Sequence, residues 1–133
     1  MLSFTRTLKH DFSGSTVKAG KTGEDLAVQY LLKKKCVILQ RNYRRRSGEI
    51  DIVVKDGLDL VFVEVKTRRS HSFGTPFEAV SLKKQRQISK VALVYLTEHN
   101  FHDQPIRFDV IAISVEGKKA HVELLKNAFE YCG

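Results

Sequence analysis

Apolar and polar residues alternate with two different periods along this chain, one typical of helices and the other typical of strands. Apolar side chains recur three and four positions apart over residues 18–34, which predicts an amphipathic helix. The same spacing over residues 81–99 predicts a second helix, with Ser81 as its N-cap. Runs rich in β-branched and aromatic residues predict five strands, over residues 36–43, 48–54, 60–67, 106–113 and 120–125.

Three further segments lack these periods. Residues 1–17 are polar and aperiodic, so we expect a flexible N-terminal arm. Residues 68–76 contain Ser, His, Gly and Pro and predict a mobile loop, whereas residues 127–131 predict a helical turn. The order helix, three strands, helix and two strands predicts an α/β fold in which helices flank one mixed sheet. Because no linker or repeat interrupts this order, we expect residues 18–133 to form a single domain.

The charge of the chain adds information about its partner. The 23 Lys and Arg residues exceed the 15 Asp and Glu residues and give a net charge of +8, which favours a polyanionic partner such as nucleic acid. A basic enzyme unrelated to nucleic acids is the alternative interpretation. No apolar run is long enough to cross a bilayer, and the N-terminus lacks the apolar segment of a secretory signal. We therefore expect a cytoplasmic protein without a membrane partner.

Two cysteines occur, Cys36 and Cys132, too few for a disulfide framework or a four-thiolate zinc site. A single bridge between them stays open as an alternative, but the cytoplasmic expectation favours two reduced thiols.

Acidic residues interrupt three of the predicted apolar patterns. Glu64 lies inside the most apolar strand, on the same face as Lys66, where burial makes a charge costly unless it has a partner. Asp51 lies in the preceding strand, and the Asp-Gly dipeptide at residues 56–57 predicts a tight hairpin that places the two strands side by side. Glu24 lies within the apolar sector of the first helix. We therefore expect Glu24, Asp51 and Glu64 to converge.

Carboxylates gathered in this way repel one another, and a divalent cation removes the repulsion. Hard oxygen ligands suit Mg²⁺ or Mn²⁺, so Asp51, Glu64 and Glu24 are the candidate metal ligands. Lys66 would orient an attacking water and offset the charge that develops on a phosphate. These four residues together predict metal-assisted phosphodiester hydrolysis. An ion pair between Glu64 and Lys66, or with a neighbour, is the alternative interpretation.

The pattern offers alternative roles for two other acids. Glu49 shares a strand face with Asp51 and is either an alternative ligand or a surface acid, and its place at the strand entrance favours the surface role. Asp109 lies between Phe108 and Val110 in a predicted core strand. We expect it to be a structural partner of Arg107 or of the first helix in preference to a ligand.

The motifs around these acids resemble a known group of proteins. Asp51 followed by Glu64-Val65-Lys66 resembles the split motif of the restriction-endonuclease-like, or PD-(D/E)XK, nucleases, although Ile50 stands where the group's proline would precede Asp51. Several blocks in order are similar to the bacterial YraN family, a group similar to archaeal Holliday junction resolvases. These blocks are Gly20 to Ala27, Arg41-Asn42-Tyr43-Arg44, Gly48 to Val53, Val61 to Arg68, Phe73-Gly74, Ala79-Val80, Lys84-Gln85 and Arg107 to Val110.

The resemblance implies a restriction-endonuclease-like αβββαβ core and a metal-dependent endonuclease that acts on branched or structured DNA. Carried over residue by residue, Asp51 and Glu64 match the metal-binding acids, Lys66 the catalytic lysine and Glu24 the helix-borne acid. Lys84 and Gln85 lie where related nucleases sometimes carry a further polar residue. The resolvases act as dimers, which leaves a homodimer open for this chain.

Basic residues lie at both open ends of the predicted hairpin, where they could contact phosphates on either side of a cut. We expect such contacts to give affinity without sequence specificity. The candidate nucleic-acid-binding residues are Arg44, Arg45, Arg46, Arg68, Arg69 and Lys84. The alternative function is a non-catalytic nucleic-acid-binding or scaffold domain that retains the nuclease fold.

Overall fold

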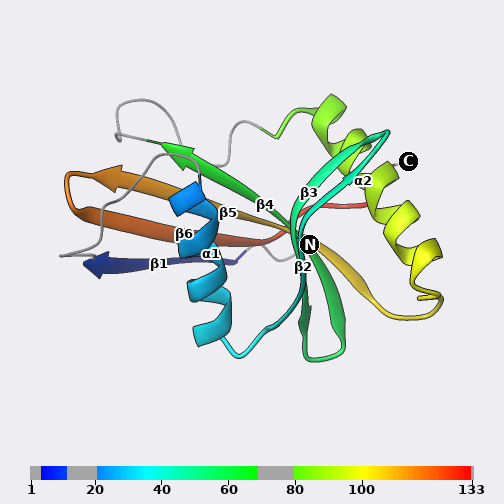
Figure 1. The fold of residues 1–133 in the computed structure, drawn as a ribbon, viewed down its shortest axis with the longest axis horizontal. Coiled ribbons are helices and arrows are strands. Elements are labelled where there is room, and N and C mark those ends of the chain that lie inside the picture. The colour runs from blue at the N-terminus through cyan, green and yellow to red at the C-terminus, as the bar shows by residue number, and fades with distance from the viewer. Residues whose placement is uncertain (1–3, 12–20, 69–79, 133) are drawn as a thin grey trace.

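The computed structural model describes residues 4–11, 21–68 and 80–132. Within these ranges the chain forms one six-stranded sheet and two helices (Figure 1). The elements are β1 (Phe4–Asp11), α1 (Lys21–Lys33), β2 (Val37–Arg45), β3 (Gly48–Asp56), β4 (Asp59–Arg68), α2 (Leu82–Glu98), β5 (Ile106–Glu116) and β6 (Lys119–Phe129).

The sheet is mixed, with the strand order β1-β6-β5-β4-β3-β2. Strands β4 and β5 are parallel because α2 crosses between them, and every other neighbouring pair is antiparallel. The run from α1 to β5 is therefore the αβββαβ core expected from the sequence. This confirms the α/β, restriction-endonuclease-like fold class.

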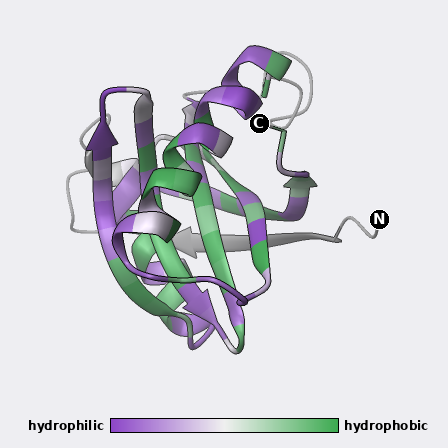
Figure 2. Ribbon diagram, turned by 90° about the vertical axis from the view of Figure 1, so that its right-hand side faces the viewer, coloured by the Kyte–Doolittle hydropathy of each residue, from purple (hydrophilic) through white to green (hydrophobic). Residues whose placement is uncertain are grey.

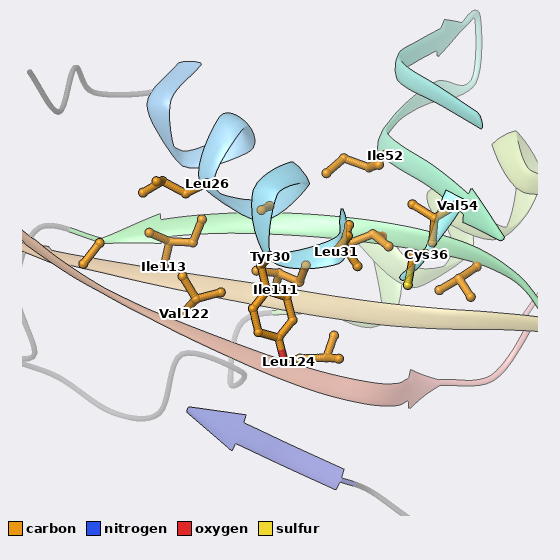
Figure 3. Close-up of a cluster of buried hydrophobic side chains, with 14 residues drawn as sticks. Leu26, Tyr30, Leu31, Cys36, Ile52, Val54, Ile111, Ile113, Val122 and Leu124 are labelled. Atoms are coloured by element: carbon orange, nitrogen blue, oxygen red, sulfur yellow. The ribbon is translucent and has the colours of Figure 1, made fainter. Parts of the chain in front are cut away.

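The two helices cover opposite faces of the sheet, because side chains alternate along each strand. Leu26, Tyr30 and Leu31 of α1 pack on one face, which includes Val61 and Val63 of β4 (Figure 3). The other face carries a second apolar cluster. This cluster includes Leu60, Phe62, Ile88, Val91, Ala92, Tyr95 and Phe108. Hydrophobic residues dominate the strands behind α2 in Figure 2, so each helix is held by its own core.

Local signals set the ends of both helices. The Ser81 hydroxyl accepts a hydrogen bond from the Lys84 backbone N–H at 3.1 Å, which confirms Ser81 as the N-cap of α2. Helix α1 ends where Cys36 N–H donates to Leu31 O and Lys35 N–H donates to Leu32 O, with Lys35 at a φ of 65°. This is a Schellman motif, and its left-handed position most often carries glycine.

The ends of the chain differ from the expected arm and helical turn. Phe4–Asp11 forms β1 and pairs with β6, whereas the rest of the expected arm, 1–3 and 12–17, lies outside the described residues. Main-chain pairing at a sheet edge holds this strand, and hydropathy periodicity does not register such pairing. In place of a helical turn at 127–131, β6 continues to Phe129 through an irregularity at Asn127, whose φ is 53°.

One arginine, whose side chain is 10% exposed, joins strands β3, β4 and β5. The Arg107 guanidinium contacts Asp109 at 2.9 Å, Asp59 at 2.9 Å and Asp56 at 2.9 Å. Asp109 also accepts a hydrogen bond from the Asn127 backbone N–H at 3.1 Å, at the irregularity in β6. The interpretation of Asp109 as a structural partner is therefore confirmed, with Arg107 as its ion-pair partner.

Other expectations have simpler outcomes. Gly57 has a φ of 62° in the turn between β3 and β4, as the hairpin prediction requires. Cys36 and Cys132 are both free thiols. Neither described helix has the length and apolar character needed to cross a membrane. Arg68 ends β4, and the remainder of the loop expected at 68–76 lies outside the described residues.

Candidate active site

The candidate site lies where β3 separates from β4. The two strands pair from Asp56 with Asp59 up to Ile52 with Val63, and the part of β3 before Ile52 pairs with β2. At this fork the Asp51 carboxylate accepts a hydrogen bond from the Val65 backbone N–H at 2.8 Å. The hairpin register thus brings Asp51 beside Glu64, as the sequence predicts.

The Asp51 and Glu64 carboxyl groups lie next to each other and influence each other's pKa. Burial raises the pKa of both carboxyl groups, and the neighbouring Asp51 charge helps to raise the pKa of Glu64 to about 7. Within the pair, the backbone N–H of Val65 lowers the pKa of Asp51, whereas the Asp51 charge raises the pKa of Glu64, so Glu64 is the group that takes up a proton more readily. Two carboxyl groups this close favour the binding of a proton or of a cation.

Glu24 of α1 and Glu49 of β3 complete the acidic cluster. One carboxylate oxygen from each of Glu24, Glu49 and Asp51 lies within 4.8 Å of the others. Burial, followed by the Asp51 charge, raises the pKa of Glu24, and Arg41 at 4.0 Å opposes this shift. The structure therefore places Glu49 beside the site, whereas the sequence favoured a surface role for this residue. Its position on the same strand face as Asp51 is the signal that could have identified it as a site residue.

Asn42 links two of these acids from β2. With its amide nitrogen facing the cluster, Asn42 donates to Glu24 Oε2 at 3.2 Å and to Glu49 Oε1 at 3.1 Å. Its backbone has a φ of 53°, a left-handed conformation that Asn tolerates better than most residues. Arg44 Nε lies 3.3 Å from Glu49 Oε2 at the rim. Asn42 and Arg44 thus hold the Glu49 carboxylate in place.

These side chains line an open cleft of about 650 Å³. Its lining residues are Glu24, Asn42, Arg44, Glu49, Asp51, Val65 and Thr67. Helix α1 reaches this cleft because Gly23 lacks a side chain: a Cβ at that position would lie 2.1 Å from Thr67 Oγ1. The close approach of α1 to the end of β4 therefore positions Glu24 over the fork.

Two lysines approach Glu64. Lys66 lies two residues after Glu64 on the same strand face, and burial lowers its pKa while the Glu64 charge raises it. Lys84 of α2 places its Nζ 3.9 Å from Glu64 Oε1. Gln85 donates its amide to Val80 O at 3.0 Å. Of the two candidates in the second helix, Lys84 contacts a site residue, whereas Gln85 bonds to the backbone before α2.

The basic residues predicted to contact nucleic acid have different surroundings. Arg44 lines the cleft, and Arg46 is exposed in the turn that follows β2. Arg45 points towards α2, where it forms an ion pair with Glu98 at 2.8 Å, and its guanidinium lies 4.2 Å from the centre of the Tyr43 ring. Arg68 lies at the end of β4, whereas Arg69 lies outside the described residues. The side chain of Arg45 therefore connects β2 to α2.

The donor set fits a hard divalent cation. Oxygens of Glu24, Glu49 and Asp51 lie within 4.8 Å of one another and Glu64 interacts with Asp51, while burial raises the pKa of Glu24, Asp51 and Glu64. All four offer oxygen, the ligand atom that Mg²⁺ and Mn²⁺ prefer. A bound cation would relieve the repulsion among these carboxylates.

Comparisons with known proteins agree with the motifs. The model of Uncharacterised protein family UPF0102 matches residues 23–113, a range that contains the four acids and Lys66. A UPF0102 protein of Geobacter metallireducens is 52% identical over 111 residues, which cover 84% of this chain and 91% of the relative. A UPF0102 protein of Dictyoglomus turgidum is 45% identical over 112 residues, which cover 83% of this chain and 95% of the relative. The chain belongs to the uncharacterised protein family UPF0102, which is the YraN family that its motifs resemble.

Proposed function

We propose that this protein is a Mg²⁺- or Mn²⁺-dependent endonuclease that hydrolyses phosphodiester bonds in branched or otherwise structured DNA. The observation that best supports this function is the fork at Asp51. There, β3 and α1 bring the carboxylates of Glu24, Glu49 and Asp51 to one cleft, and Glu64 of β4 lies beside Asp51 with Lys66 and Lys84 close to it. An acidic cleft in a chain of net charge +8 suits a polyanion held by the basic surface around an acidic centre.

Each residue then has a distinct role in the reaction. A bound cation would polarise the phosphate and lower the pKa of a water that it holds. Asp51 is oriented by Val65 N–H and Glu49 by Asn42 and Arg44, so both present oxygens of fixed direction. Lys66 would stabilise the negative charge that develops on the phosphate, because its ammonium lies on the face that carries Glu64.

The exposed arginines would hold the flanking phosphates. Arg44 at the cleft rim and Arg46 in the turn after β2 are suited to this, and Arg68 lies at the end of the neighbouring strand. Contacts of this kind position a nucleic acid and weaken as salt concentration rises. A cytoplasmic location agrees with the two free cysteines.

A second candidate function is non-catalytic nucleic-acid binding, and one observation favours it. Burial raises the pKa of both Asp51 and Glu64, and a protonated Glu64 would relieve the repulsion within this pair without a metal. A domain of that kind would bind DNA in a salt-dependent manner, would show no metal-dependent turnover, and would bind equally well after Lys66→Met.

Cleavage assays decide between the two functions. The protein is incubated with four-way junctions, flaps, single strands, linear duplex and an RNA hairpin, with Mg²⁺ or Mn²⁺. We expect the branched DNA to be cut, and Glu64→Gln and Lys66→Met to slow cutting by roughly 100-fold or more. The exposed residues Glu130 and Lys118 provide the matched controls Glu130→Gln and Lys118→Met. Absence of cleavage on every substrate, or site variants as fast as their controls, would refute the enzymatic function.

A further inference from the structure

A second hollow lies beside the acidic cleft, on the other side of the turn between β2 and β3. Its volume is about 380 Å³, and its lining residues are Ser47, Lys83, Arg86, Gln87 and Lys90. Four of these come from α2 at positions three and four residues apart, so they share one face of the helix. The lining contains three cations and no carboxylate.

The walls of this hollow are fixed by contacts with the hairpin. A Cβ at Gly48, whose φ is 147°, would lie 2.7 Å from the Gln87 side chain, so the turn rests directly on α2. Farther along α2, Glu98 accepts hydrogen bonds from Arg45 at 2.8 Å and from the Tyr43 hydroxyl. The hairpin therefore contacts α2 at two places, Gln87 and Glu98.

The charge of the hollow is not neutralised within the described part of the chain. Arg44 and Arg45, on the adjacent hairpin, each have a carboxylate partner, Glu49 and Glu98. Lys83, Arg86 and Lys90 have no such partner among the described residues, and all three are exposed. Three like charges on one helix face repel one another, and an anion that bridges them relieves this repulsion.

The position of the hollow points to the same polyanion that the acidic cleft would take. Ser47 borders the hollow, whereas Glu49, two residues later, lines the cleft. Lys83 borders the hollow, whereas its neighbour Lys84 contacts Glu64. A strand that crosses the turn between β2 and β3 would therefore have phosphates on both sides of it.

We propose that this hollow is a second phosphate-binding site, at which Lys83, Arg86 and Lys90 hold the DNA backbone beside the cleavage cleft. The inference rests on the proposed function for its ligand, but it concerns binding and not cutting. Because the contacts are to phosphates, they add affinity and salt dependence and leave sequence preference unchanged.

Binding without turnover tests the proposal. A labelled four-way junction and a labelled duplex are titrated in EDTA over a range of salt concentrations, and binding is followed by fluorescence anisotropy. We expect Lys83→Gln with Lys90→Gln to weaken binding roughly tenfold and to reduce the slope of log K against log salt by about two. The matched control is Lys118→Gln with Lys119→Gln, an equal charge loss where the turn after β5 meets the start of β6 (Figure 1).

The control pair should change affinity less than about twofold and leave the slope unchanged. The proposal is refuted when the Lys83→Gln, Lys90→Gln variant and the control variant weaken binding equally, or when neither weakens it. It is also refuted when the Lys83→Gln, Lys90→Gln variant loses affinity for phosphatidylglycerol vesicles and not for DNA. Cleavage is scored separately with metal. A loss of DNA binding in the Lys83→Gln, Lys90→Gln variant supports this phosphate site even where the wild type cuts no substrate. The binding proposal and the endonuclease proposal therefore fail independently.

Discussion

The Asp51 carboxylate accepts a hydrogen bond from the backbone N–H of Val65 at 2.8 Å. This bond lies where β3 has stopped pairing with β4, since the pairing ends at Ile52 and Val63. The Asp51 side chain thus accepts a hydrogen bond from a main-chain N–H that has no partner on β3, because the two strands have separated at this point. The same carboxylate lines the acidic cleft, so one side chain both stabilises the fork and contributes to the candidate metal site.

Two substitutions separate these roles of Asp51. In Asp51→Asn the amide oxygen can still accept from Val65 N–H, so we expect the free energy of unfolding to stay equal or to rise as repulsion from Glu49 and Glu64 decreases. Asp51→Ala leaves the Val65 N–H unpaired and should lower the free energy of unfolding by about 1–3 kcal/mol. Urea denaturation compares the two, and calorimetry should show that both lose Mn²⁺ binding. Equal stability of the two variants would show that the hydrogen bond contributes nothing.

Metal affinity tests the place of Glu49 in the cluster. Because its carboxylate oxygen lies within 4.8 Å of those of Glu24 and Asp51, we expect Glu49→Gln to weaken Mn²⁺ binding at least about tenfold, as Glu24→Gln should. The exposed Asp103 provides the control Asp103→Asn, which should stay within about twofold. Wild-type affinity in Glu49→Gln, measured by calorimetry, would restrict Glu49 to pairing with Arg44 and Asn42.

Stability of the metal-free protein should depend on pH through Glu64. Its pKa rises from 4.5 to about 7 on folding, so between these values the folded state binds more protons than the unfolded state. The contribution of Glu64 protonation to the free energy of unfolding is fully present below about pH 4.5, and it is lost as the pH rises through 7. Relative to the wild type, Glu64→Gln should therefore become more stable, by on the order of 2–3 kcal/mol, between pH 5 and pH 8.

Urea denaturation in EDTA at the two pH values provides this measurement, with Glu130→Gln as the exposed control. The control should follow the wild type at both values. A difference between wild type and Glu64→Gln that is the same at pH 5 and pH 8 would show that the Glu64 pKa is not raised.

The parts of the fold that the sequence predicted correctly follow from local rules. Alternation along β4 placed Val61 and Val63 on one face and Phe62 on the other, as the two cores confirm. The Asp-Gly turn set the register that brings Asp51 to Glu64. Glu24 was found because an acid in the apolar sector of a helix contradicts its surroundings. The convergence of these acids needed no knowledge of distant contacts.

The errors concern contacts between residues far apart in the chain. Strand β1 is held by β6, more than 100 residues later, so the local polar composition indicated an arm. The sequence grouped Arg45 with Arg44 and Arg46 as candidate phosphate contacts, and it gave no sign of the ion pair with Glu98, which lies 53 residues away. Alternation along β2 would have separated Arg45 from Arg44, because consecutive side chains of a strand point to opposite faces.

Arg107 should be among the residues most important for stability. Its side chain is 10% exposed and neutralises Asp109, whose side chain is 1% exposed. Arg107→Met leaves that buried carboxylate unpaired, so we expect a loss of about 3–5 kcal/mol in the free energy of unfolding. Adding Asp109→Asn removes the unpaired charge and should recover part of the loss. The exposed control Arg86→Met should change stability by less than about 0.5 kcal/mol, measured by urea denaturation. A loss below about 1 kcal/mol in Arg107→Met would contradict this role.

Glycine at position 35 should stabilise the protein. Lys35 has a φ of 65° in the Schellman motif that ends α1, and a side chain in this left-handed region is strained. Lys35→Gly removes the strain but increases the entropy of the unfolded chain, so we expect a net gain of about 0.5–1 kcal/mol. The last residue of α1 provides the comparison: Lys33→Gly should lose a similar amount, because glycine is unfavourable within a helix. Urea midpoints measure both, and a loss of stability in Lys35→Gly would show that interactions of the lysine side chain outweigh the backbone strain.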